Sequence, residues 1–213
     1  MRKIFYSMIG IAAAILAGGL WWRRESLRRQ LPCPAWLAWM LENPFMDTIA
    51  GTQTTLDHIG VEPGDRLLDV GSGPGRLAIP AAQRAGPGGL VSVVDIQPQM
   101  LARLRQRAAL AAVQNIEIHH LDISAENSLD AGSYDRAWLV TVLGEIPDKA
   151  SALRSIYRAL KPGGTLSITE ILPDPHYQRR STVLDLAVSA GFEPAQHWGN
   201  FLSFTQNFVK PAQ

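Results

Sequence analysis

The first clue to the fold is a stretch in which an apolar run gives way to three alternating glycines. Residues 67–70 predict a buried strand, and Gly71, Gly73 and Gly75 let the chain turn sharply into a helix. The glycines let a ligand approach the backbone, and the first N–H groups of that helix are free to bind it. The next apolar run ends at Asp95, where a carboxylate can hold a ribose by its hydroxyls. The pattern predicts a binding site for a small molecule that contains a nucleoside.

Three details of this stretch narrow the choice of cofactor. The dinucleotide-binding fingerprint has its third glycine where this chain has Arg76, and no Gly-Lys-Ser/Thr follows as a phosphate-binding P-loop requires. The carboxylate of Asp69 would repel a pyrophosphate but favours a ligand with an ammonium or sulfonium charge. S-adenosylmethionine carries both cations and a ribose. It is therefore the predicted cofactor, and an NAD-dependent reductase is a distant alternative.

Further motifs follow the glycine-rich stretch in a fixed order along the chain. They are Leu67–Arg76 itself, Asp95, His120–Ile123, Ser133–Val140 and Leu160–Leu166. With these motifs, residues 45–210 resemble the class I S-adenosylmethionine-dependent methyltransferases, and most closely the ubiquinone/menaquinone-type and related small-molecule enzymes. The resemblance implies an α/β, Rossmann-like fold. Its seven-stranded, mostly parallel sheet would have helices on both faces and an antiparallel last strand.

The resemblance also suggests which residues contact S-adenosylmethionine. The expected cofactor-binding residues are Asp69, Gly71, Ser72, Gly73, Gly75, Asp95, Ile96, Met100, Asp122, Ile123 and Val140. Asp95 would hold the ribose and Asp122 the adenine amino group. Two alternatives stay open, because Asp122 could instead cap the following short helix, and Ile96 and Met100 could simply pack in the core.

The rest of the chain alternates between strand and helix patterns, which indicates a parallel sheet covered on both faces. Strands are predicted at 66–70, 90–95, 116–120, 134–140 and 165–171, and helices at 48–59, 75–85, 98–112, 148–160 and 178–190. Residues 192–197 and 203–210 are expected to form a closing pair of strands. Pro80 is expected to kink the helix at 75–85.

The sequence says less about the methyl acceptor. Glu145 follows the fourth predicted strand, at the sheet edge where ligands of such folds bind, and it is the catalytic candidate. It could orient or deprotonate the acceptor, or only cap the next helix. The chain lacks the Asn/Asp-Pro-Pro-Tyr motif, which argues against a planar amide or nucleobase nitrogen as acceptor. His176 and Tyr177 are interpreted as part of an ordinary loop. The histidines lack metal-ligand spacing, so no metal is predicted.

Residues 1–30 have the pattern of a membrane anchor. Residues 4–22 carry no charge, and a helix of that length spans roughly 28 Å, close to the thickness of a bilayer's hydrocarbon core. Trp21 and Trp22 suit the membrane interface, and the arginines that follow place the C-terminal side in the cytoplasm. A cleaved signal peptide is the alternative. We expect residues 31–47 to form an amphipathic linker and residues 48–213 the methyltransferase domain.

The charge distribution argues against a nucleic-acid partner. Residues 1–30 hold six basic groups and one acid, whereas the whole chain has a net charge of +1, so residues 31–213 carry about −4. The basic cluster lies beside the predicted span, where anionic lipids would attract it.

Together these features predict a single-pass, membrane-tethered methyltransferase whose catalytic domain lies in the cytoplasm. Tethering favours a small hydrophobic or amphipathic acceptor, such as a lipid, a quinone precursor or a thiol. Two alternatives remain: a protein methyltransferase, and a non-catalytic module that binds S-adenosylmethionine at the membrane.

Overall fold

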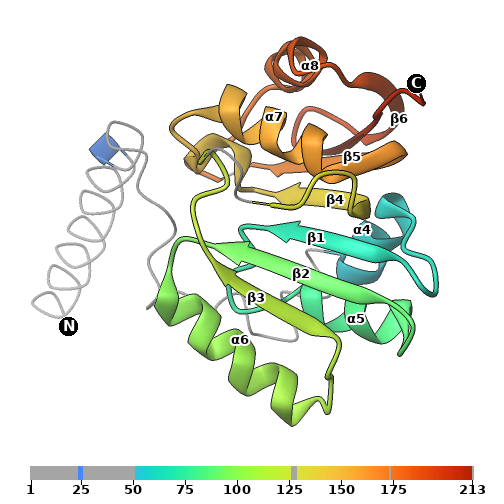
Figure 1. The fold of residues 1–213 in the computed structure, drawn as a ribbon. Coiled ribbons are helices and arrows are strands. Elements are labelled where there is room, and N and C mark those ends of the chain that lie inside the picture. The colour runs from blue at the N-terminus through green and yellow to red at the C-terminus, as the bar shows by residue number, and fades with distance from the viewer. Residues whose placement is uncertain (1–23, 26–50, 126–128, 173, 213) are drawn as a thin grey trace, which may run out of the picture.

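A seven-stranded sheet is the scaffold of the computed structural model, which describes residues 24–25, 51–125, 129–172 and 174–212 (Figure 1). The strands are β1 (Arg66–Val70), β2 (Leu90–Asp95), β3 (Ile116–His120), β4 (Tyr134–Val140), β5 (Leu160–Ile171), β6 (Glu193–Gly199) and β7 (Ser203–Val209). Their order across the sheet is β3-β2-β1-β4-β5-β7-β6, and β7 is antiparallel to both of its neighbours. This confirms the predicted Rossmann-like sheet with an antiparallel last strand.

Helices cover both faces of the sheet (Figure 1). They are α4 (Thr52–Ile59), α5 (Ala78–Ala85), α6 (Pro98–Leu110), α7 (Lys149–Ala159) and α8 (Arg180–Ser189), with a short 3₁₀ helix, η2 (Leu143–Glu145), after β4. Side chains from α4, α5 and α6 form one apolar cluster with the sheet, and side chains from α7 and α8 form another.

The apolar run in strand β1 reflects the position of this strand between two layers of helices. Leu67 and Leu68 are both fully buried, but they belong to different clusters because successive side chains of a strand point to opposite faces. A strand in the middle of a parallel sheet is covered twice and is therefore apolar on both faces. Asp69 interrupts this run with a buried carboxyl group, next to the turn that begins at Gly71.

Among the differences between predicted and observed boundaries, those of α5 and β5 have structural consequences. Helix α5 begins at Ala78 rather than at residue 75, so Pro80 lies in its first turn, where a proline needs no N–H and causes no kink. The kink predicted at Pro80 was therefore wrong. Strand β5 begins at Leu160 rather than at residue 165, and its register with β4 shifts at a bulge between these two positions.

The predicted membrane span at residues 4–22 and the amphipathic linker at residues 31–47 lie outside the described residues. Within the part of the chain that the structure describes, no helix is long and apolar enough to cross a bilayer. The described domain begins at Gly51, next to Thr52, whose hydroxyl accepts a hydrogen bond from Arg76 Nη1 at 3.0 Å.

Candidate cofactor site

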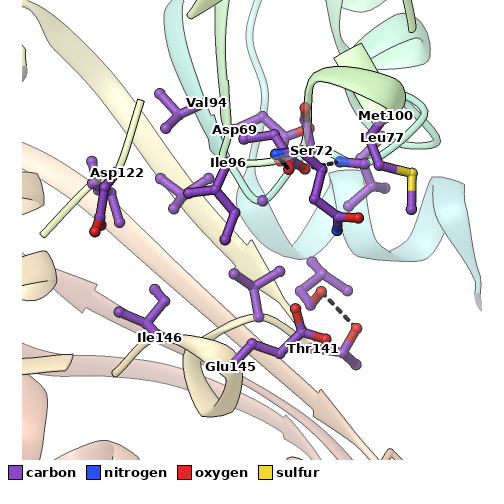
Figure 2. Close-up of a pocket in the computed structure, with 18 of the residues that line it drawn as sticks. Asp69, Ser72, Leu77, Val94, Ile96, Met100, Asp122, Thr141, Glu145 and Ile146 are labelled. Atoms are coloured by element: carbon purple, nitrogen blue, oxygen red, sulfur yellow. Dashed lines mark hydrogen bonds between the residues drawn. The ribbon is translucent and has the colours of Figure 1, made fainter. Parts of the chain in front are cut away.

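A cleft of about 300 Å³ opens at the carboxyl ends of β1, β2 and β4 (Figure 2). Because β1 lies between β2 and β4, the loops that follow these three strands meet here. Residues 71–74 form one wall, residues 95–97 a second and residues 140–142 a third. In open α/β sheets this edge is where ligands bind.

The glycine turn is held tightly between β2 and the loop after β4. Gly71 has a φ of +72°, and its N–H donates to the carbonyl of Val94 at 2.7 Å. A Cβ at this position would lie 2.5 Å from Cγ2 of Val142. Gly71 is therefore required both by its left-handed backbone and by the close approach of Val142. Gly73 also has a positive φ, of +52°, but a Cβ there would meet nothing within 4 Å.

Asp95 ties this turn to the second strand. Its Oδ2 accepts the N–H of Gly73 at 2.9 Å, and its Oδ1 accepts the N–H of Gln97 at 2.8 Å. Burial raises the pKa of Asp95 above its ordinary value despite these hydrogen bonds. Each carboxylate oxygen can accept a second hydrogen bond, so Asp95 can hold the turn and still bind ribose hydroxyls.

Asp69 is buried at the base of the cleft. Only 3% of its surface is exposed, and its Oδ2 has no hydrogen-bond partner. Burial raises the pKa of Asp69 to about 8, and nearby Asp95 adds to the increase while Arg76 opposes it. The neighbouring residue in β4 is Trp138, and its buried indole N–H, which faces the carboxyl group of Asp69, also opposes this increase. Ionising a carboxyl group this deeply buried is costly, and a positively charged ligand group would compensate for that cost.

The side of the cleft predicted to bind adenine combines apolar and polar groups. Met100 is buried in α6, Ile123 is buried after β3, and Ile96 is 52% exposed; all three line the cleft. Asp122 lines it too (Figure 2), and its Oδ1 accepts hydrogen bonds from the N–H and the hydroxyl of Ser124. Asp122 thus stabilises the turn after β3 and remains available to a ligand; among the described residues no short helix follows for it to cap.

The opposite end of the cleft follows β4. Thr141 has a φ of +56°, which is rare for a β-branched residue and stores strain of about 1–3 kcal/mol. Half-buried Glu145 in η2 lines this end together with Ile146 (Figure 2). Asp174 lines it as well. Burial raises the pKa of Asp174 above its ordinary value. This end therefore presents apolar side chains and two carboxyl groups.

The structure brings most of the predicted residues together at the cleft. Those that line it are Asp69, Gly71, Ser72, Gly73, Asp95, Ile96, Met100, Asp122, Ile123, Val140 and Glu145. Gly75 differs from them, because a Cβ there would lie 2.9 Å from Cγ of Leu104 in α6. Its role in the structure is to let the turn pack against that helix.

Sequence reasoning did not assign a role in the site to several lining residues, among them Thr141 and Asp174. The strain at Thr141 depends on how the chain leaves β4, and no local pattern signals it. Asp174 lies between Pro173 and Pro175, and its position after the fifth predicted strand was a weak signal. His176 and Tyr177 do not line the cleft; the backbone of His176 packs against Gly144 instead.

The residues present fit the predicted cofactor. Two buried polar atoms on the cleft wall, Asp69 Oδ2 and Ser72 Oγ, have no hydrogen-bond partner, and S-adenosylmethionine offers an ammonium group and hydroxyls. Ile96 and Met100 offer an apolar surface for a base. Among the residues described, no group of three or more His, Cys, Asp or Glu could hold a metal ion.

Comparison with known proteins gives matches over most of this domain. A family model described as a methyltransferase domain matches residues 61–202, more than half of the chain. A ubiquinone/menaquinone biosynthesis C-methyltransferase from Vibrio cholerae is 35% identical over 117 residues, which cover 54% of this chain and 45% of the relative. Nocamycin O-methyltransferase from Saccharothrix syringae is 33% identical over 120 residues, which cover 56% and 42%. The chain thus spans somewhat less than half the length of these curated relatives.

A solved structure shares the fold. The crystal structure of an S-adenosylmethionine-dependent methyltransferase from Aquifex aeolicus matches with a TM-score of 0.77, covering 84% of this chain and 100% of that one. The sequences are 18% identical, so this likeness concerns the fold alone.

Proposed function

The chain belongs to the methyltransferase domain family, in its class I S-adenosylmethionine-dependent branch, and we propose that it methylates a small hydrophobic or amphipathic acceptor at a membrane. The observation that carries this proposal is the open cleft in which the buried carboxyl group of Asp69, with its raised pKa, lies beside the turn at Gly71 and Gly73. A cation with an attached nucleoside suits this site better than a pyrophosphate does.

The main task of the protein in this reaction is to position the methyl donor and the acceptor. S-adenosylmethionine supplies a methyl group on a sulfonium sulfur, already activated for in-line displacement by a lone pair of the acceptor. Asp69 would bind the positive charge, and Asp95 would bind the ribose while keeping Gly73 in place. Ile96 and Met100 would confine the adenine. Holding two reactants in line in this way can supply much of the rate enhancement.

The end of the cleft at Glu145 would receive the acceptor. Val142 and Ile146 offer apolar contacts there, while Glu145 and Asp174 offer hydrogen-bond acceptors. Two carboxyl groups disfavour an anionic acceptor and favour a neutral or cationic one with N–H, O–H or S–H groups. Where the acceptor atom must lose a proton, Glu145 is placed to take it.

The predicted anchor supports an acceptor that dissolves in lipid. A tether at residues 4–22 would confine the cleft near the bilayer and raise its effective concentration toward such molecules. The basic residues that follow the span support a catalytic domain on the cytoplasmic side. The relative from Vibrio cholerae is named for ubiquinone/menaquinone biosynthesis, and a quinone precursor would suit this setting.

The test uses the full chain in vesicles together with methyl-labelled S-adenosylmethionine. A lipid extract is placed either in the same vesicles as the protein or in separate vesicles. We expect the label to enter the extract, and mainly in the shared vesicles. Equal labelling of both vesicle populations would contradict the tethered arrangement. Label in co-purified proteins would support protein methylation, and tight cofactor binding without any transfer would support a non-catalytic module.

A further inference from the structure

Three large apolar side chains are exposed together at the end of the sheet where the carboxyl end of β5 lies. Leu172 is 37% exposed, Phe201 is 76% exposed and Leu202 is 51% exposed. The N–H of Leu172 donates to the carbonyl of Leu202 at 2.7 Å, which joins the end of β5 to the turn between β6 and β7. We call these three residues the apolar rim. Exposed apolar side chains that gather at one place on a surface can form a contact site for another phase or molecule.

The apolar rim lies at the same edge of the sheet as the mouth of the cleft. In the β5–β7 pair Ile171 lies opposite Ser203, so the turn at residues 200–202 is at the carboxyl end of β5. The loop after β5 connects the two features: it contributes Asp174 to the cleft, and Tyr177 donates its hydroxyl to the carbonyl of Phe201 at 2.8 Å.

Two exposed arginines follow Tyr177 along the chain, at the start of α8. Arg180 lies at the start of α8, and its Nε donates to Gln206 Oε1 of β7 at 3.0 Å. Arg179 precedes it, and its charge acts on the phenol of Tyr177, the residue bonded to Phe201. Apolar side chains beside exposed arginines are the composition of a surface that lies on an anionic membrane.

The predicted anchor alone would not orient the cleft. Residues 23–50 separate the predicted span from Gly51 and could reach at most about 95 Å. A domain of this size is only about 40 Å across. Such a connection would keep the domain near the bilayer but allow any of its faces to meet the lipid. Thr52, the first residue of α4, is bonded to Arg76 at the cleft, so the chain also enters the described domain at this end of the sheet.

We propose that the apolar rim, together with Arg179 and Arg180, is a membrane-contacting surface that inserts shallowly into an anionic bilayer. This contact turns the mouth of the cleft toward the lipid and gives a lipid-dissolved acceptor a direct route to Glu145. The inference rests on the proposed tethered function. It adds a second attachment point to the membrane. The anchor would limit the distance of the domain from the bilayer, and the apolar rim would fix the orientation of the domain.

The test locates individual residues relative to the lipid in the full chain. Cys33 is the single cysteine of the chain and is replaced by serine. One new cysteine is then introduced as Phe201→Cys or Leu202→Cys and carries a fluorophore. The matched control is Leu110→Cys, because Leu110 is 89% exposed and ends α6 at the opposite edge of the sheet. The labelled chains are reconstituted in anionic vesicles that contain nitroxide-bearing lipids.

We expect the lipid nitroxides to quench the labels at positions 201 and 202 about threefold more strongly than the label at position 110. The double substitution of Arg179→Gln and Arg180→Gln should reduce this difference, as should vesicles made only of neutral lipid. Equal quenching at all three positions would overturn the proposal.

A second readout separates this proposal from the proposed function. Phe201→Glu should slow methylation of a lipid-dissolved acceptor about tenfold while leaving the affinity for S-adenosylmethionine unchanged, and Leu110→Glu should do neither. If no acceptor is methylated but the quenching pattern holds, the proposed function fails and the membrane surface stands. If methylation proceeds and Phe201→Glu does not affect it, the surface fails and the function stands.

Discussion

Asp95 accepts the backbone N–H of Gly73 at 2.9 Å, and this hydrogen bond joins the second strand to the glycine turn after the first. The sequence pattern suggested only a ribose-binding role for this carboxylate. In the structure it also fixes the turn against which the cofactor would lie. Binding of the cofactor and the conformation of the glycine turn therefore both depend on the side chain of Asp95.

Replacing Asp95 with asparagine tests this coupling. An amide presents an NH₂ group to one of the two N–H donors, so the Asp95→Asn chain loses a hydrogen bond and gains a repulsive contact. We expect unfolding to require about 1–3 kcal/mol less free energy, and the affinity for S-adenosylmethionine to fall about tenfold or more. Urea unfolding and calorimetry measure the two effects. Asp185→Asn, at an exposed position of α8, should change neither.

Alanine at Gly71 and at Gly73 should give unequal losses of stability. Both residues have positive φ, so each substitution costs about 1–2 kcal/mol in backbone strain. At Gly71 the new methyl group would also press on Val142, which adds about 1–3 kcal/mol. Urea unfolding of the two variants should therefore show Gly71→Ala to be clearly less stable. Equal losses would mean that the Val142 contact relaxes freely.

The buried acid at Asp69 predicts that cofactor binding depends on pH. Because its pKa is raised to about 8, the unliganded carboxyl group is protonated at neutral pH, and binding a cation should expel that proton. Affinity for S-adenosylmethionine should rise as the pH increases from 6 to 8 and then level off. The raised pKa also means that this group favours the folded state most at acidic pH, and that its contribution is lost as the pH rises through about 8.

Two variants serve as references for this pH dependence. In Asp69→Asn the affinity for S-adenosylmethionine should no longer rise with pH because of this carboxyl group. Only the pH dependence that comes from titration of the cofactor itself should remain. Glu170 is an equally buried acid whose pKa burial also raises to about 8, but it does not line the cleft. Glu170→Gln should therefore keep the slope. A slope that survives in Asp69→Asn would show that Asp69 does not meet the cation.

Glu145 can be tested apart from cofactor binding. If it accepts the acceptor's proton, Glu145→Gln should lower kcat about 10²-fold or more while leaving the dissociation constant of S-adenosylmethionine unchanged. The loss should shrink when the acceptor is supplied at high pH in its deprotonated form. Glu193→Gln, at an exposed position of β6, is the matched control. An unchanged kcat would show that Glu145 takes no proton from the acceptor; it does not cap the next helix either, because Asp148 caps α7.

The sequence was most informative where local pattern and structure coincide. The apolar run at Leu67 and Leu68 predicted a strand covered on both faces, and the glycines placed the turn that follows it. The sequence was less informative where contacts between distant parts of the chain determine the bounds of an element. The early start of β5 depends on its bulge against β4, and Gly163 and Gly164 exchange hydrogen bonds with Lys210, far along the chain.

The same division holds within the site. Asp69 and Asp95 could be identified because each ends a local motif. The strain at Thr141 and the placement of Asp174 could not, because both depend on how the loops after β4 and β5 pack on each other. The second role of Asp95 could not be predicted either, since it depends on the exact separation of two loops 22 residues apart.

A calorimetric titration of the full chain with S-adenosylmethionine, its demethylated product and NADH decides which cofactor the cleft binds. We expect one site per chain for the first two ligands, weakened in Asp69→Asn, and no measurable binding of NADH. Binding of NADH together with no binding of either sulfur nucleoside would contradict this expectation.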